Sequence, residues 1–437
     1  MATKKRTKKI SIIGLGYVGL ANYVLPAPLF TEVVGYDTDE EKVRALNQGT
    51  YPVDELKLKR VLSKPIKNHK ITSNPEDLKG SFAYFISVGT PEKEDGSCDL
   101  SYFEAAVDLI KSSATLPDTY IVIRSTVEIG TADRLKESLK DEPIHYHVIS
   151  VPEFLREGSS YDDELNPDRI VIGSDKEEEA KAILNLRKDV VSKGIPVYWM
   201  SNVSAETTKY ASNFFLALKI AYANEMARVS GAYGADIKDV LNSVGADHRI
   251  GRSMLGAGIG FGGSCLPKDL RALSHSAKDK GVLVPLLDGA LDSNVRQRKY
   301  LLDKMHQYLG DLKGKTIAVA GLSFKEGVAD VRSSLALPFM EELHREGAIV
   351  NGFDLSEEAL MQLKDSPYHL YHELKDAVKD ADALVFLTGE KRFKTINEAN
   401  LLKAMPGRFI FDGRNIFSLQ YFKYFHYISI GRPDQIK

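Results

Sequence analysis

The chain has 437 residues, and its 58 Lys and Arg against 60 Asp and Glu give a formal net charge of −2. Hydrophobic residues make up 43% and charged residues 27%, which is typical of a soluble globular protein and excludes long disordered segments. The balanced charge excludes a general basic surface for nucleic acid or anionic membranes. At about 150 residues per domain, the length predicts roughly two to four domains.

The cysteine count and the hydrophobic runs limit the cellular setting. Two cysteines, Cys98 and Cys265, are too few for a disulfide framework, so a reducing, cytoplasmic setting is expected. The sequence contains no run of about 18 apolar residues, so no transmembrane helix is expected. The basic start, Lys4 to Lys9, leads into a short strand-like run instead of an apolar leader, so a solvated tail is expected.

Residues 1–200 alternate short apolar runs with amphipathic stretches, which is typical of a parallel, doubly wound sheet. His145 and His147 have no Cys or His partner at ligand spacing, so no metal site is expected there. Trp199 ends a further predicted strand and is expected in the core. The predicted strands are Ile10–Ile13, Glu32–Tyr36, Phe82–Val88, Tyr120–Arg124, His147–Ser150 and Arg169–Ile172.

A glycine-rich turn, Gly14-Leu15-Gly16-Tyr17-Val18-Gly19, follows the first predicted strand and opens a helix. In this context the first glycine permits the turn, the second admits a pyrophosphate and the third allows close helix–strand packing. Asp37 closes the next strand, where a carboxylate binds a ribose hydroxyl, and neighbouring acidic residues disfavour a 2′-phosphate. The pattern predicts NAD rather than NADP. Pro26 and Pro28 predict that the helix ends early or kinks.

The region from 201 to 300 is predicted to be a central helical segment. Residues 205–231 hold no proline, no glycine before Gly231, and many apolar side chains. A helix of this length spans about 40 Å. Its nearly continuous apolarity predicts burial on several sides, between domains or between subunits.

The strand–helix alternation restarts in residues 301–437. Thr316–Ala320 is a predicted strand, a helix is predicted from Leu335 to Arg345, and the strand Ala348–Phe353 ends at Asp354. This order echoes the start of the chain up to Asp37. The fold is therefore predicted to be α/β, with two Rossmann-like, doubly wound domains joined by a long central helix.

Cys265 lies in the stretch Gly260-Phe261-Gly262-Gly263-Ser264-Cys265-Leu266-Pro267-Lys268-Asp269. Glycines let a backbone wrap closely around a ligand, and Pro267 fits the first turn of a helix. Cys265 is then expected at a helix N-terminus with Lys268 one turn away, and both features favour the thiolate. The residues alone leave a nucleophile and a buried structural cysteine as alternatives. Cys98 lacks such surroundings and is expected to be inert.

Nine motifs in order resemble the nucleotide-sugar 6-dehydrogenase family, the NAD-dependent enzymes that oxidise the C6 alcohol of a nucleotide-linked sugar to a carboxylate. The resemblance spans nearly the whole chain. The motifs are the Gly14 turn, Val88–Pro91, Ser125–Val127, Pro152–Gly158, Lys209–Asn213, Arg249–Gly251, the Cys265 stretch, Phe324-Lys325 with Asp330 and Arg332, and Asp412–Arg414.

The resemblance implies specific catalytic roles. Cys265 matches the nucleophile that forms a thiohemiacetal and then a thioester, and Lys209 and Asn213 match the groups that stabilise charge on the C6 oxygen. Glu153 matches the carboxylate that activates or positions the hydrolytic water. Asp269 matches the partner of the network formed by Lys209 and water, and Thr126 matches a threonine that holds water near the cofactor.

The resemblance also implies binding residues and a homodimer, in which Arg249 reaches the substrate of the neighbouring subunit. The cofactor residues are expected to be Gly14, Leu15, Gly16, Tyr17, Val18, Gly19, Asp37, Lys42, Thr90, Thr126, Glu157, Lys268 and Arg332. The substrate residues are expected to be Glu153, Phe154, Leu155, Lys209, Asn213, Arg249, Phe261, Gly262, Phe324, Lys325 and Arg414.

The Gly-Phe-Gly-Gly-Ser-Cys form argues against the N-acetylhexosamine branch of the family, and GDP-mannose dehydrogenases share it. The expected substrate is UDP-glucose, with GDP-mannose as the alternative. Two other classes remain as alternatives. A non-redox thiol enzyme such as an acyl transferase leaves the Gly14–Asp37 pattern without a purpose. An inactive nucleotide-sugar sensor needs none of Cys265, Lys209 and Asp269, and all three are present.

Overall fold

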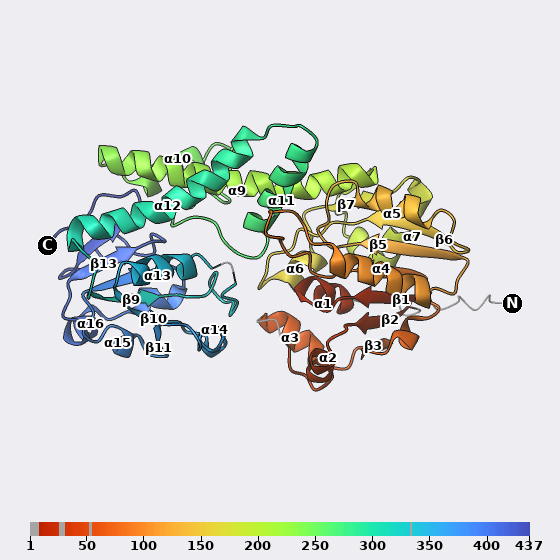
Figure 1. The fold of residues 1–437 in the computed structure, drawn as a ribbon, viewed down its shortest axis with the longest axis horizontal. Coiled ribbons are helices and arrows are strands. Elements are labelled where there is room, and N and C mark those ends of the chain that lie inside the picture. Colours follow the sequence, from red (N-terminus) through yellow and green to blue (C-terminus); the bar gives the residue numbers. More distant parts are fainter. Residues whose placement is uncertain (1–7, 26–30, 52–54, 333) are drawn as a thin grey trace. The chain divides into compact units, whose positions relative to one another are not determined.

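The computed structural model describes residues 8–25, 31–51, 55–332 and 334–437. The start of the predicted basic tail, together with Pro26 and Pro28, lies outside these residues. The chain forms two compact units, Met1–Ser212 with Arg271–Gly281 and Asn213–Leu270 with Val282–Lys437. Each unit contains one sheet (Figure 1). The prediction of three segments, 1–200, 201–300 and 301–437, stays a prediction.

The first unit is built on an eight-stranded sheet in the order β3-β2-β1-β4-β5-β6-β7-β8. Its first six positions have the strand order of a dinucleotide-binding fold. The expectation of a wholly parallel sheet is wrong at one place, because β7 pairs antiparallel with β6 through Ser150 and Gly173. The strands are β1 Lys8–Ile13, β2 Thr31–Tyr36, β3 His69–Thr72, β4 Ala83–Ile86, β5 Asp118–Ile123, β6 His145–Ser150, β7 Ile170–Gly173 and β8 Val197–Met200.

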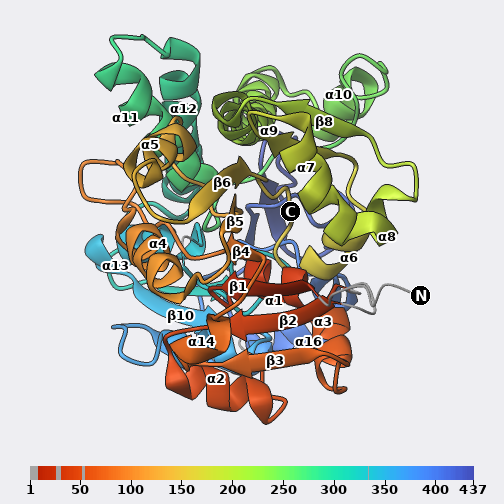
Figure 2. The ribbon, with the colours of Figure 1, turned by 90° about the vertical axis from the view of Figure 1, so that its right-hand side faces the viewer.

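Helices cover both faces of this sheet, because neighbouring strand residues point to opposite sides. Ile121 and Ile123 pack with α4 and α5, whereas Val122 packs with α1 and α7. Figure 2 shows α4 and α5 on one side of the central strands and α7 and α8 on the other. The helices are α1 Tyr17–Tyr23, α2 Glu40–Asn47, α3 Leu56–Leu62, η1 Pro75–Leu78, α4 Ser101–Ser113, α5 Thr131–Leu139, α6 Ser160–Leu165, α7 Glu177–Leu184, η2 Asn185–Arg187 and α8 Lys188–Val191.

Trp199 departs from the sequence prediction, which placed it in the core. Its side chain is 47% exposed, and its indole N–H donates a hydrogen bond of 2.9 Å to the Ser174 hydroxyl. The reason is topological. Its strand β8 is the last strand of the sheet, so neither face is fully covered.

The predicted central helix is present and longer than expected, as α9, Asn202–Tyr233. It is not buried on all sides within the chain, because Phe215, Tyr222 and Val229 are exposed. No helix among the described residues is long and apolar enough to cross a bilayer. The other helices of this region are α10 Ile237–Val244, α11 Leu266–Asp279 and α12 Pro285–Leu309.

The second unit repeats the strand order of the first in a six-stranded parallel sheet, β11-β10-β9-β12-β13-β14. One face packs against α12 and α13, and the other against α15, α16 and an aromatic cluster. The remaining elements are β9 Thr316–Ala320, α13 Ala336–Arg345, β10 Ile349–Phe353, α14 Glu357–Gln362, β11 His369–Tyr371, α15 Leu374–Ala377, β12 Ala383–Phe386, η3 Lys391–Thr395, α16 Glu398–Ala404, β13 Phe409–Asp412 and β14 His426–Ser429. The predicted α/β fold with two Rossmann-like sheets is confirmed.

Candidate active site

The glycine turn follows β1 as predicted. Gly14 has φ of +91°, a conformation that favours glycine, and its N–H donates to the Tyr36 carbonyl at 2.9 Å. A Cβ on Gly19 would overlap the carbonyl oxygen of Gly14, so only glycine lets α1 approach the strand this closely. A Cβ on Gly16 would meet nothing within 4 Å. The turn therefore leaves open space at the position where a dinucleotide pyrophosphate would approach the backbone.

Asp37 follows β2 and is buried. One carboxylate oxygen accepts hydrogen bonds of 2.9 Å from the Leu15 N–H and from the Lys42 ammonium. The predicted cofactor residues Leu15, Asp37 and Lys42 thus lie together beside the glycine turn. In the second unit Asp354 holds the equivalent turn, because it accepts from the N–H groups of Leu322 and Ser323 at 2.7 and 2.9 Å.

The predicted residues after β4, β5 and β6 also form contacts with one another. Thr90 donates a hydrogen bond of 2.8 Å to the Thr126 carbonyl. Lys209 of α9 donates to both the carbonyl oxygen and a carboxylate oxygen of Glu153, each at 2.8 Å. Both side chains are only 5% exposed. Burial strengthens this charge pair, and the hydrogen bond from Lys209 orients the Glu153 carboxylate.

The segment after Glu153 contains the other predicted residues of this unit. The Phe154 ring lies under the Arg169 guanidinium at 4.0 Å and 5.6 Å from the Lys209 ammonium. Leu155 donates its N–H to Glu153 at 2.5 Å, and Glu157 is half-buried. The contacts hold the predicted sugar-pocket residues next to the buried ion pair.

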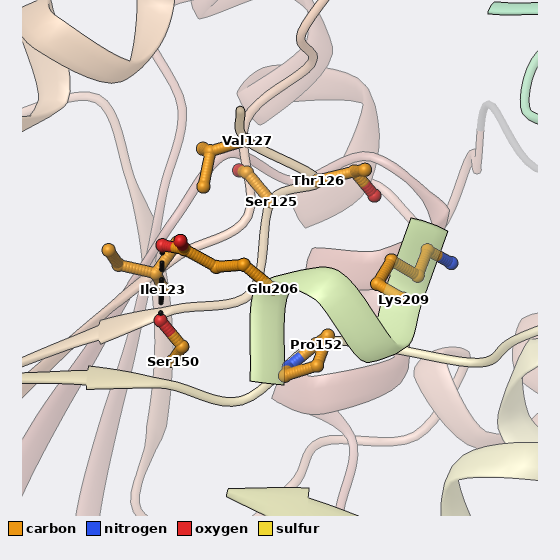
Figure 3. Close-up of a pocket in the computed structure, with 8 residues that line it drawn as sticks. All are labelled: Ile123, Ser125, Thr126, Val127, Ser150, Pro152, Glu206 and Lys209. Atoms are coloured by element: carbon orange, nitrogen blue, oxygen red, sulfur yellow. Dashed lines mark hydrogen bonds between the residues drawn. The ribbon is translucent and has the colours of Figure 1, made fainter. Parts of the chain in front are cut away.

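A small pocket, with room for little more than a water molecule, lies between Thr126 and Lys209. Figure 3 shows Glu206 and Lys209 leaving α9 in different directions, with Glu206 directed toward Ser150. The other lining residues are Ile123, Ser125, Val127 and Pro152.

Glu206 was missed by the sequence analysis. Its carboxylate accepts hydrogen bonds from the backbone N–H groups of Gly130 and Ala132, at 2.6 and 2.9 Å, at the start of α5. Burial raises the pKa of this carboxyl, although the two N–H donors oppose the shift. An available signal was a carboxylate one helical turn before Lys209, on a helix otherwise rich in apolar residues.

In the second unit, Cys265 immediately precedes α11, as predicted. Its carbonyl accepts the Asp269 N–H at 2.9 Å, the first bond of that helix, and its thiol lies 3.7 Å from the Ser264 hydroxyl. The thiol is partly exposed, whereas Cys98 in the first unit is buried beside Tyr210. The positive end of the helix favours a thiolate at Cys265.

The loop that carries Cys265 is held by a side chain that the sequence analysis missed. Asn294 of α12 accepts from the Phe261 N–H at 2.7 Å and donates to the Phe261 carbonyl at 2.8 Å. Gly263 has φ of +86°, and a Cβ there would overlap the Phe324 ring. Asn294 is a buried amide within a long helix, and only the fold reveals its partner.

A buried polar network surrounds Asp269, which is 1% exposed. Asn213 of α9 donates a hydrogen bond of 2.6 Å to one carboxylate oxygen. Lys268 donates to the other oxygen at 2.7 Å. The network brings Asn213, Lys268 and Asp269 together one turn into the helix that Cys265 precedes.

The predicted cationic residues of the second unit differ in their surroundings. Arg414 is half-buried and donates to the carbonyls of Leu387 and Gly260, at 2.8 and 3.1 Å, so it links the end of β13 to the Cys265 loop. Lys325 lies 5.7 Å from the Phe324 ring.

Two predicted arginines are exposed and have acidic neighbours. Arg249 pairs with Asp247 at 2.6 Å, and Arg332 pairs with Asp330 at 2.7 Å. The contacts among the predicted site residues form separate groups: Leu15, Asp37 and Lys42; Thr90 and Thr126; Glu153 and Lys209; and Asn213, Lys268 and Asp269.

Comparison with known proteins identifies relatives over nearly the whole chain. Three models of the UDP-glucose/GDP-mannose dehydrogenase family match, as the NAD binding domain at residues 8–191, the central domain at 203–296 and the UDP binding domain at 318–419. The UDP-glucose 6-dehydrogenase TuaD of Bacillus subtilis is 37% identical over 98% of this chain and 94% of its own length. The UDP-glucose 6-dehydrogenase of Rickettsia bellii is 37% identical over 93% of this chain and 95% of its own.

Solved structures agree with these matches. A UDP-glucose dehydrogenase from the hyperthermophilic archaeon Pyrobaculum islandicum has a TM-score of 0.89 and 32% identity, covering 99% of this chain and all of its own. A UDP-D-ManNAc dehydrogenase from Pyrococcus horikoshii has a TM-score of 0.85 and 29% identity, covering 97% of this chain and 99% of its own.

Proposed function

The chain belongs to the UDP-glucose/GDP-mannose dehydrogenase family, and on that premise we propose that it oxidises UDP-glucose to UDP-glucuronate with two molecules of NAD. The observation that carries the proposal is Cys265 at the start of α11, with Asp269 and its network one turn further on. UDP-glucose is favoured because relatives named UDP-glucose 6-dehydrogenase are 35–37% identical over most of the chain.

The first unit would hold NAD. The open space above Gly16 suits the pyrophosphate, and Asp37 offers a carboxylate to an adenosine ribose. NAD, when bound, accepts hydride from the sugar. Thr90 and Thr126 lie near the carboxyl ends of β4 and β5, the edge at which sheets of this kind bind nicotinamide cofactors.

The first half of the proposed reaction converts the C6 alcohol to an aldehyde. The carbon loses a hydride and the hydroxyl loses a proton, so two electrons leave the sugar. Lys209 and Asn213, four residues apart on α9, are proposed to stabilise the negative charge on the C6 oxygen.

The second half uses Cys265. Its thiolate adds to the aldehyde carbon, forming a C–S bond, and the oxygen takes a proton to give a thiohemiacetal. Loss of a second hydride and of the hydroxyl proton leaves a thioester. Water, positioned by Glu153, then adds to the thioester carbon and the C–S bond breaks. The thiol is restored and the carboxylate leaves with one oxygen from water.

The remaining predicted residues are proposed to bind the nucleotide sugar. Lys325 and Arg414 are cations suited to the diphosphate. Phe261, Gly262 and Phe324 lie on or against the Cys265 loop and are proposed to line the sugar pocket.

We also propose a homodimer formed through α9. Phe215, Tyr222 and Val229 recur every seven residues, so they share one face of the helix, and all three are exposed. Large apolar side chains exposed along one helix face mark an interaction surface. Arg249, also exposed, is proposed to reach the substrate of the neighbouring subunit.

A cytoplasmic location is proposed from the chemistry. The mechanism requires the side chain of Cys265 as a thiol or thiolate. A reducing compartment keeps such a thiol available.

The test is to mix the purified protein with NAD and a limiting amount of each nucleotide sugar and to follow NADH by its absorbance. We expect about two NADH per UDP-glucose, because the thioester route removes two hydrides. Two NADH per GDP-mannose, with none from UDP-glucose, would establish the alternative substrate. No NADH with any nucleotide sugar would refute the proposed enzyme.

Two cysteine variants separate the thioester route from other chemistry. Cys265→Ala is expected to abolish turnover and to retain NAD binding. The control, Cys98→Ala, removes the other thiol and is expected to keep the stoichiometry of two NADH. Full activity in Cys265→Ala would contradict the thioester route.

A further inference from the structure

A cluster of metal-ligating side chains lies where β5 and β6 begin. The two strands pair in parallel, with Asp118 opposite His145 and Tyr120 opposite His147. Side chains alternate along a strand, so residues 118, 120, 145 and 147 lie on one face of the sheet. The register therefore brings a carboxylate beside two imidazoles, although His145 comes 27 positions after Asp118 in the chain.

The spacing of these groups fits a bound metal ion. One Asp118 carboxylate oxygen lies 3.2 Å from His145 Nδ1 and 3.5 Å from His147 Nε2. The three ligand atoms lie within 4.8 Å of one another. Metal–ligand bonds of about 2.0–2.1 Å in a tetrahedral zinc site place neighbouring ligand atoms about 3.3 Å apart. The separations of 3.2 and 3.5 Å from the Asp118 oxygen to the two histidine nitrogens are close to that value.

The surroundings orient His147 for this role. Its Nδ1 lies 3.0 Å from a Glu179 carboxylate oxygen of α7, which leaves Nε2 directed at Asp118. Its ring stacks on Tyr120, with centroids 4.5 Å apart and planes at 19°. A carboxylate behind a ligating histidine is the usual support in zinc sites, because it fixes the tautomer and raises the basicity of the ligand.

We propose that Asp118, His145 and His147 form a binding site for a divalent transition-metal ion, with Zn²⁺ the best fit. Two imidazoles and one carboxylate suit Zn²⁺ and related ions, whereas Mg²⁺ and Ca²⁺ prefer sites made of oxygen ligands. Asp118 and His145 are exposed, so water has access to the fourth position.

The place of the site in the sheet determines its expected effect. The ligands lie at the start of β5 and β6, whereas Thr126 and Glu153 follow the carboxyl ends of the same strands. A six-residue strand spans about 16 Å, so the ion would take no part in the reaction. It would instead tie β5 to β6 and stabilise the folded first unit.

The site is tested with Zn²⁺ alone, added to protein that has been stripped of metal with EDTA. Because a reactive thiolate also binds zinc, the reference protein is Cys265→Ala, compared with wild type. We expect one zinc per chain in the reference protein by equilibrium dialysis, and a rise in the midpoint of thermal unfolding. No zinc bound at 100 μM free ion, or binding without any rise in that midpoint, would overturn the proposal.

Further variants of the reference protein locate the ion. His145→Ala and Asp118→Asn change exposed residues and are expected to weaken zinc binding at least about tenfold and to abolish the thermal shift. Glu179→Ala is expected to weaken binding about 10–100-fold through the support that it gives to His147. The matched control is His275→Ala, since His275 lies 3.3 Å from Asp279, and it is expected to leave zinc binding unchanged.

Unchanged zinc affinity in both His145→Ala and Asp118→Asn would overturn the site even if the protein binds zinc elsewhere. The readouts are metal content and thermal stability. They do not depend on the proposed dehydrogenase activity, so failure of one proposal leaves the other open to its own test.

Discussion

At the scale of single residues, Gly16 is a position where a substitution is expected to affect cofactor binding without disturbing the fold. It precedes α1 with φ of −76° and ψ of −170°, which alanine also adopts. A methyl group there would touch nothing within the protein, but it would enter the space proposed for the pyrophosphate. Gly16→Ala is therefore expected to weaken NAD binding at least about tenfold, since close backbone approach is the role of this glycine.

Calorimetric titration of NAD, together with a thermal unfolding curve, checks this prediction. The unfolding midpoint of Gly16→Ala should stay close to that of wild type. Gly289→Ala, in α12, also places a methyl group in open space and is the control that should bind NAD normally. If NAD affinity is unchanged in Gly16→Ala, the cofactor does not approach this turn.

At the scale of elements, a buried ion network joins the end of β5 to α6 and η2. Glu164 accepts from Arg124 at 2.8 and 2.9 Å and from Arg187 at 2.6 Å, and Arg124 also donates to the Val151 carbonyl at 3.1 Å. Val151 is two residues before Glu153. The network thus supports the backbone that presents the proposed water-positioning carboxylate.

Glu164→Gln is expected to lower the free energy of unfolding by about 3 kcal/mol at neutral pH, because it leaves two buried guanidinium groups without their counter-charge. Urea unfolding followed by circular dichroism measures this change. The control is Glu76→Gln, which removes a partner of Lys79 at the surface and should cost less than about 1 kcal/mol. A loss of similar size in both variants would argue against a structural role for the network.

The same network predicts a pH dependence. Burial alone would raise the pKa of Glu164, but Arg124 and Arg187 outweigh it and hold the pKa below its usual range. The folded state therefore binds this proton less tightly than the unfolded state. The stabilisation is present at neutral pH and is lost as the pH falls through the lowered pKa. The difference in stability between wild type and Glu164→Gln should accordingly shrink in acid.

At the scale of the whole molecule, the exposed stripe on α9 predicts the oligomeric state. Tyr222→Asp places a charge in the centre of the proposed interface and is expected to raise the dimer dissociation constant at least about 30-fold, as for other buried aromatic contacts. Sedimentation velocity over a range of protein concentrations measures this. Leu56→Asp, on α3, changes an isolated exposed side chain and should not alter assembly. A wild-type monomer at high concentration would refute the interface.

Several features could be predicted from the sequence because they depend on short stretches of chain. The glycine turn, Asp37 at the end of β2 and Cys265 before α11 each follow from steric requirements or from the spacing of a few residues. The strand–helix alternation indicated two Rossmann-like sheets, because the spacing of apolar residues in a strand or helix shows which of its faces is buried.

Other features depend on contacts between segments that are distant in the sequence. The antiparallel pairing of β7 and the exposure of Trp199 depend on the position of a strand in the sheet, which local pattern does not encode. Asn294 and Glu206 have partners that are backbone groups far away in the chain. The register of β5 against β6 likewise brings Asp118 next to His145 and His147. The spacing of these three residues in the sequence does not predict that they lie close together. Strand order and register are set by the packing of whole layers, so contacts of this kind appear only in the tertiary structure.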